Sequence, residues 1–104
     1  MGENEVTVRF HGVRGSTACH SQATQRYGGN TSCVSVDFGS DSPIIFDLGT
    51  GLRYMSCSED DAASPKPFIG ACLLTHLHWD HIQGLPFFKP LLHPDTVIDI
   101  YGPR

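Results

Sequence analysis

The strongest constraint in this sequence is a cluster of histidine and aspartate side chains directly after a short apolar run. Residues 71–74 form the run, and residues 76–81 hold three imidazoles and one carboxylate within six positions. A short apolar run bounded by polar residues is typical of a buried strand. In open α/β sheets, chemistry gathers at the carboxyl ends of strands, where this cluster begins. The chain is therefore expected to fold around a sheet that presents the cluster at one edge.

The residue types in the cluster predict a metal site. Imidazole nitrogen and carboxylate oxygen are ligands that zinc and neighbouring first-row metals accept. Packing alone gives no reason to crowd four costly polar groups beside a buried strand. The candidate ligands are His76, His78, Asp80 and His81. They can point in different directions from one turn of chain and so serve two neighbouring metal positions. The isolated histidines are interpreted as polar loop residues: His11, His20 and His93.

The cluster and its flanks resemble a known family. Residues 76–81, HLHWDH, resemble the HxHxDH signature of the metallo-β-lactamase superfamily. The wider segment 75–88 is similar to the phosphodiesterase-like branch, which includes ribonuclease Z and phosphoribosyl cyclic phosphate phosphodiesterases. Three further stretches fit that branch: residues 12–16 (GVRGS), 27–33 (YGGNTSC) and 46–51 (FDLGTG). The resemblance covers nearly the whole chain.

The resemblance implies roles for five residues. His76 and His78 would bind a first divalent ion, and Asp80 and His81 a second. The ions, zinc with manganese as the alternative, would share a hydroxide that attacks the substrate. Asp80 can also orient this water, which makes it the candidate catalytic residue. Asp47 would support the histidine loop without binding metal, because metal-bound histidines usually need such a partner; a structural turn or cap is its alternative role.

The patterns along the chain predict alternating strands and short helices. We expect strands at residues 6–10, 32–38, 43–48, 71–75 and 97–101, with the first one half-buried. A helix is expected at 50–56, a short one after Pro86, and loops at 11–29 and 58–66. This order resembles the first half of the αββα sandwich of the superfamily, an α/β (α+β) fold with mainly antiparallel strands. Residues 1–104 are then the amino-terminal part of one hydrolase domain, truncated.

The missing part of the site follows from the same resemblance. A third histidine for the first ion, a bridging aspartate and a later histidine should all come after Arg104, as should the general acid. His93 and Asp95 lie too close to the first motif and are interpreted as loop residues beside Pro90 and Pro94. The isolated chain is expected to bind metal weakly, since two protein ligands per ion fall short of the usual three or four.

Composition limits the cellular setting and the partners. A net charge of −4 argues against a general nucleic-acid surface, so nucleic acid is not favoured as a partner. No leader and no apolar run of about 20 residues is visible, which predicts a cytoplasmic protein away from membranes; a homodimer is left open. The cysteines form no C-x-x-C pair, and two are expected to be buried free thiols, Cys33 and Cys72.

Three hypotheses about function follow from the motif and its surroundings. The leading one is metal-dependent hydrolysis of a small phosphodiester, either a cyclic nucleotide or a cyclic phosphate, by the full-length protein. The second keeps the site and changes the bond to a thioester, lactone or β-lactam, because function depends on the pocket and not on the fold. Processing of transfer-RNA 3′ ends is a narrower option. The third is an inactive metal-binding fragment.

Overall fold

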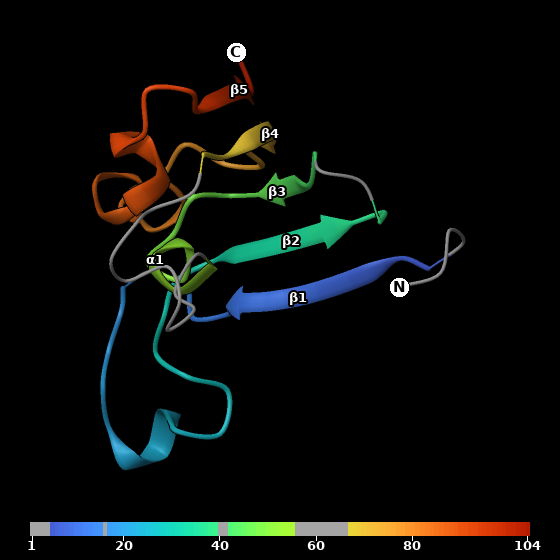
Figure 1. The fold of residues 1–104 in the computed structure, drawn as a ribbon. Coiled ribbons are helices and arrows are strands. Elements are labelled where there is room, and N and C mark those ends of the chain that lie inside the picture. Colours follow the sequence, from blue (N-terminus) through green and yellow to red (C-terminus); the bar gives the residue numbers. More distant parts are fainter. Residues whose placement is uncertain (1–4, 16, 40–41, 56–66) are drawn as a thin grey trace.

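A computed structural model describes residues 5–15, 17–39, 42–55 and 67–104, so the loop predicted at 58–66 lies outside the described residues. Within them the chain forms a five-stranded sheet in the order β1-β2-β3-β4-β5 (Figure 1). The strands are β1 (Thr7–Gly12), β2 (Cys33–Asp37), β3 (Ile44–Phe46), β4 (Ile69–Leu73) and β5 (Val97–Tyr101). The helical segments are α1 (Leu52–Met55) and the 3₁₀ turns η1 (Gln22–Thr24), η3 (Trp79–His81), η4 (Leu85–Phe87) and η5 (Lys89–Leu92).

The sheet is mixed. β1, β2 and β3 pair in antiparallel fashion, whereas β4 lies parallel to β3 and β5 lies parallel to β4. The predicted α/β class is confirmed, and the expected antiparallel pairing holds for the first three strands alone. Parallel strands end at the same edge of a sheet. The residues that follow β3 and β4 are therefore brought together, which places the end of the 43–48 segment beside the histidine cluster.

One face of the sheet, here called the covered face, carries the hydrophobic core. Ile45 of β3 and Cys72 of β4 are fully buried on it, and Leu52 of α1 belongs to the same buried cluster. The rings of Phe68 and Phe88 meet edge to face with their centroids 5.4 Å apart. The complete set of buried hydrophobic residues is Cys33, Ile45, Leu48, Leu52, Phe68, Cys72 and Phe88.

The opposite face, here called the open face, is apolar as well, and none of its described side chains is buried. The strand pairing puts Phe10, Val34 and Phe46 in one row that continues to β5. Phe10 is 71% exposed and Val8 is 49% exposed. The prediction of a half-buried first strand was therefore wrong, because no described segment covers this face. Its large apolar members are Val8, Phe10, Val34, Val36, Ile44, Phe46, Ile69, Leu73, Val97 and Tyr101, and the same register places Ala71 and the charged Asp99 on this face.

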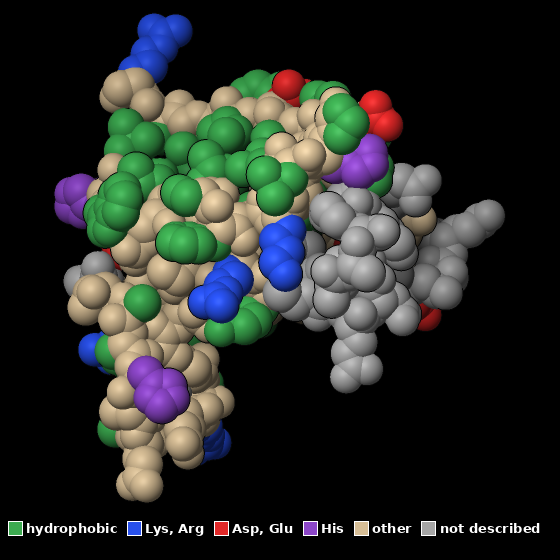
Figure 2. All heavy atoms as spheres, turned by 60° about the vertical axis from the view of Figure 1, so that its left-hand side comes forward, with side chains coloured by type: hydrophobic (Ala, Val, Ile, Leu, Met, Phe, Trp, Pro, Cys, Tyr) green, Lys and Arg blue, Asp and Glu red, His purple; other side chains and the backbone are tan. Residues whose placement is uncertain are grey.

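The segment after residue 84 forms two 3₁₀ turns where a short helix was expected. Pro86 and Pro90 each stand in the first turn of η4 and η5, where a missing N–H is tolerated but a longer helix is not favoured. Phe88 is buried, whereas Phe87 and Leu92 remain exposed. In Figure 2 hydrophobic side chains gather above two basic ones on this side of the molecule. None of the described helices is long and apolar enough to cross a membrane.

Candidate metal centre

The histidine loop, residues 74–84, is fastened to the chain that follows β3. Leu48 N donates to His81 O at 2.7 Å, and Gly84 N donates to Leu48 O at 2.8 Å. The two segments approach so closely that a Cβ on Gly84 would lie 1.9 Å from the carbonyl oxygen of Gly49. Only glycine can be accommodated at such a contact without moving the backbone. The end of the predicted motif is thus held by backbone bonds on the covered side of the sheet.

Asp47 holds the start of the same loop. Its carboxylate accepts hydrogen bonds from Thr75 N at 2.9 Å and Thr75 Oγ1 at 2.7 Å, and its own N–H donates to Leu73 O at 3.1 Å. Asp47 is 3% exposed and has φ of +68°. A non-glycine residue in this region is uncommon, and aspartate is among the residues that tolerate it best. Asp47 is therefore both a turn residue and an anchor for the loop; its support of a metal-bound histidine stays a prediction.

The three histidines of the motif adjoin one another. The ring centroids of His76 and His78 are 3.8 Å apart at an interplanar angle of 81°, and those of His76 and His81 are 5.2 Å apart at 66°. His76 and His78 are exposed, whereas Asp80 is 9% exposed. The loop therefore presents two imidazoles to solvent above a nearly buried carboxylate.

His81 lies between two carboxylates. Its Nε2 is 3.3 Å from Asp80 Oδ2, and its Nδ1 is 3.2 Å from Asp47 Oδ2. The direction from Nδ1 to Asp47 is unsuited to a hydrogen bond, so this buried nitrogen is left unsatisfied. Buried polar atoms without a partner are rare and cost free energy. The imidazole of His81 is thus held near Asp47 without a completed hydrogen bond.

The donor chemistry of the loop fits a divalent ion, whereas its geometry does not show a closed site. Imidazole and carboxylate groups converge, as a nitrogen- and oxygen-ligated metal requires. Among the described residues, however, no three His, Cys, Asp or Glu side chains are placed to hold one ion together. Trp79, which lies between the second histidine and the aspartate of the motif, is 67% exposed and does not pack into the core.

The structure also brings the flanking stretches to the histidine loop. Gln83 Nε2 donates to Thr31 Oγ1 at 3.2 Å, and Thr31 and Thr50 bind each other through N–H to Oγ1 bonds of 2.8 and 2.7 Å. Arg14 N donates to Asn30 O at 2.9 Å. The stretches 12–16, 27–33 and 46–51 therefore meet at one place. Sequence reasoning missed the roles of Gln83 and Thr50, although Thr50 lies in a stretch that had been recognised.

The remaining histidines and cysteines lie outside this cluster. His93 and Asp95 form a local turn through an Asp95 N to His93 Nδ1 bond of 3.1 Å, as interpreted from the sequence. His11 belongs to β1 and not to a loop. Its Nε2 makes a hydrogen bond of 2.8 Å with Ser35 Oγ of the neighbouring strand β2. Burial raises the pKa of Cys33 to about 12 and that of Cys72 to about 11, and both are buried free thiols, as predicted.

A comparison with known protein families adds to this geometry. The family model described as the metallo-beta-lactamase superfamily matches residues 26–99, which is most of the chain. The matched region runs from the stretch before β2 through the histidine loop to β5. The chain has no significant match among curated proteins or among solved structures.

Proposed function

The chain belongs to the metallo-beta-lactamase superfamily, and from this premise we propose that its complete form hydrolyses a small phosphodiester, either a cyclic nucleotide or a cyclic phosphate. Membership supports a metal-dependent hydrolase, and the superfamily usually binds divalent metals, often zinc. The observation that carries the finer proposal is the meeting of three stretches, 12–16, 27–33 and 46–51, at the histidine loop. These are the stretches that resemble the phosphodiesterase-like branch.

In this proposal the loop residues hold two ions. His76 and His78 serve the first, and Asp80 and His81 serve the second. Bound divalent ions of this kind supply Lewis acidity and an activated water at neutral pH. Asp80 is nearly buried and 3.3 Å from His81 Nε2, which suits a carboxylate that orients a water. Asp47 keeps the loop in place through Thr75, and its Oδ2 lies 3.2 Å from His81 Nδ1, where it would complete a hydrogen bond to that ring once a metal orients it.

We further propose that residues 1–104 are the amino-terminal part of a larger hydrolase domain. The open face supports this, because a contiguous apolar surface is typical of a face that another segment covers. A longer polypeptide would supply the third histidine, the bridging aspartate and the last histidine. A cytoplasmic location, a small-molecule partner in preference to nucleic acid, and a homodimer stay predictions.

Hydrolysis of bis(4-nitrophenyl) phosphate by the longer polypeptide with zinc or manganese tests the function. We expect turnover that Asp80→Asn and His76→Ala each lower by at least about 100-fold, since both remove a metal contact. His93→Ala, in the local turn outside the cluster, is the matched histidine control. Turnover of a thioester or nitrocefin-like reporter with no cleavage of any phosphodiester would favour the carbonyl-hydrolase alternative.

Metal binding by residues 1–104 alone tests the proposed incompleteness. We expect weak zinc binding without a fixed stoichiometry in a calorimetric titration, because each ion has two protein ligands. A tight site for two ions in this chain would refute the truncation. A longer polypeptide that binds zinc but hydrolyses neither class of substrate would leave the non-catalytic metal-binding hypothesis.

A further inference from the structure

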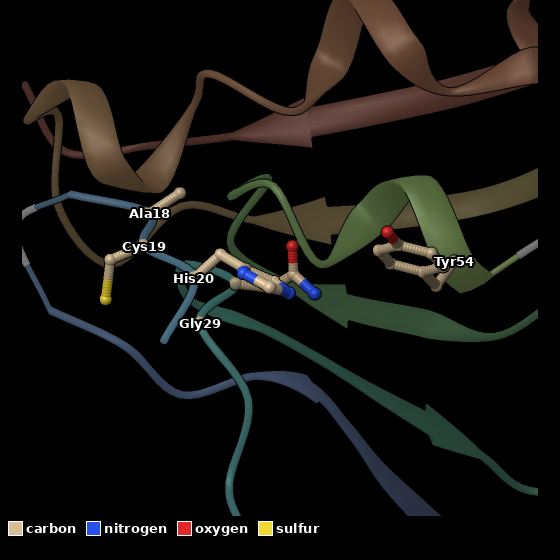
Figure 3. Close-up of a pocket in the computed structure, with 6 residues that line it drawn as sticks. Ala18, Cys19, His20, Gly29 and Tyr54 are labelled. Carbon is tan, nitrogen blue, oxygen red and sulfur yellow. The ribbon is translucent and has the colours of Figure 1, made fainter. Parts of the chain in front are cut away.

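A hollow of about 430 Å³ lies between the segment that joins β1 to β2 and the helix α1 (Figure 3). Its volume falls within the usual range of small-molecule sites. The loop contributes two short pieces, residues 18–20 and residues 29–30, and α1 contributes Tyr54. The lining residues are Ala18, Cys19, His20, Gly29, Asn30 and Tyr54.

The walls of this pocket are fixed by backbone contacts. Cys19 N donates to Gly29 O at 2.9 Å, and a Cβ on Gly29 would lie 1.4 Å from Cys19 O, so the two loop pieces are in direct contact. Asn30 is held through the bond from Arg14 N to its carbonyl oxygen, and Tyr54 N donates to Gly51 O at 3.1 Å. A pocket held in this way costs little ordering entropy when a ligand binds.

The lining is neutral in fixed charge and rich in flat polar groups. No Lys, Arg, Asp or Glu is among the described residues that line it. Tyr54 is 53% exposed, with the guanidinium carbon of Arg53 5.6 Å from its ring centroid. In Figure 3 the His20 ring projects toward Tyr54, whereas the Cys19 sulfur points away from it. An exposed aromatic ring offers a stacking platform for a base, and a carboxamide such as that of Asn30 can both donate to and accept from a base edge.

The pocket is connected to the histidine loop. Asn30 directly precedes Thr31, whose Oγ1 accepts the hydrogen bond from Gln83 Nε2, and Gln83 follows His81 by two residues. The backbone of Thr31 is in turn bound to Thr50, shortly before α1. Thr31 is fully buried, so the wall of the pocket and the histidine loop are joined through the interior by a short chain of hydrogen bonds.

We propose that this pocket binds the base of a nucleotide substrate, with the base stacked on Tyr54 and its edge hydrogen-bonded by Asn30. The inference rests on the proposed phosphodiester hydrolysis and names the substrate class, a cyclic nucleotide. A neutral pocket suits the uncharged base, and in this proposal the phosphate binds at the histidine loop, to which the pocket wall is joined through Thr31 and Gln83. His20 closes the pocket opposite Tyr54.

Titration of adenosine into residues 1–104, followed by heteronuclear NMR, tests the pocket without phosphate and without metal. We expect shifts of the His20, Asn30 and Tyr54 signals and an affinity that Tyr54→Ala weakens about tenfold, since stacking is lost. Tyr54→Phe keeps the ring and should retain the affinity. Tyr27→Ala is the matched control, because Tyr27 is 72% exposed and has the guanidinium carbon of Arg26 5.3 Å from its ring centroid, yet lies outside the pocket.

The outcomes separate this inference from the proposed function. Equal adenosine affinity in Tyr54→Ala and Tyr27→Ala overturns the pocket assignment, as does an Asn30→Ala variant that binds like the unaltered chain. If the longer polypeptide cleaves bis(4-nitrophenyl) phosphate while adenosine does not bind, the inference fails and the proposed function stands. If adenosine binds through Tyr54 but no phosphodiester is cleaved, the base pocket stands and the proposed function fails.

Discussion

Both faces of the sheet carry apolar side chains, but the two faces differ in how far those side chains are covered. Ile44 and Ile45 are neighbours in β3, yet Ile45 is fully buried in the core of the covered face, whereas Ile44 is only partly buried on the open face. The same holds along β2, where Cys33 is buried and Val34 is not. Strands that are apolar on both sides are typical of a sheet with layers on both faces. The apolar pattern of a strand therefore predicts that it belongs to a buried layer, but the pattern does not say which segment covers each face.

The largest effect should come from truncating the covered face. Ile45→Ala is expected to lower the free energy of unfolding by roughly 2–5 kcal/mol, because it leaves a cavity in the packed core. Ile44→Ala removes the same atoms from the open face and should cost roughly 1 kcal/mol or less. Urea denaturation of the two variants measures the difference. Equal losses would mean that the open face is covered in the folded chain.

The next effect concerns Asp47, which lies between Phe46 of the open face and Leu48 of the covered core. Asp47→Ala removes two hydrogen bonds to a buried carboxylate and should cost about 3 kcal/mol. Asp47→Gly relieves the positive φ but loses the same hydrogen bonds. A similar loss of unfolding free energy in Asp47→Gly identifies the side chain as the cause, whereas a near-neutral result identifies the backbone. Amide exchange at Thr75 should accelerate in both variants. Protection of that amide in Asp47→Gly would contradict the anchor role.

Thiol reactivity compares the faces directly. Burial raises the pKa of Cys33 to about 12 and that of Cys72 to about 11, so both should resist iodoacetamide at pH 8 while the partly exposed Cys19 reacts. A Val36→Cys variant places a thiol on the open face, where we expect modification at least about tenfold faster than at Cys33. Peptide mass mapping gives the rates. An inert thiol at position 36 would show that a second layer, such as another copy of the chain, covers this face.

The smallest effect is a pH dependence from His11. Burial, with a smaller contribution from Arg9, lowers the pKa of His11 below its ordinary 6.5. The unfolded chain then takes up the proton first as the pH falls through 6.5, so the free energy of unfolding should fall until the pH passes below the lowered folded pKa, and then level off. His11→Gln should remove this component while keeping a polar partner for Ser35. An unchanged pH profile in that variant would exclude His11 as the source.

Sequence patterns were sufficient for the strands, the helix and the location of the histidine loop. Alternation and turn residues placed β1 to β5 within a few positions, because those signals are local. The parallel pairing of β3, β4 and β5 and the exposure of Phe10 depend on long-range packing, which periodicity does not encode. The site followed the same division. Asp47 and the histidines were proposed from the motif, whereas Gln83 was missed because its contact with Thr31 joins residues 52 positions apart.

Those long-range bonds bear on how the site assembles. Asp47 meets Thr75 across 28 residues, and Leu48 binds His81 and Gly84 across the parallel pair of β3 and β4. Each contact needs a large chain loop to close before it forms, and such contacts form slowly during folding. A synthetic peptide of residues 71–84 would carry all four candidate ligands and lack the bonds to Asp47, Leu48 and Thr31 that fasten the loop to the rest of the chain. We therefore expect the histidine loop to become ordered late, after β3 and β4 have paired.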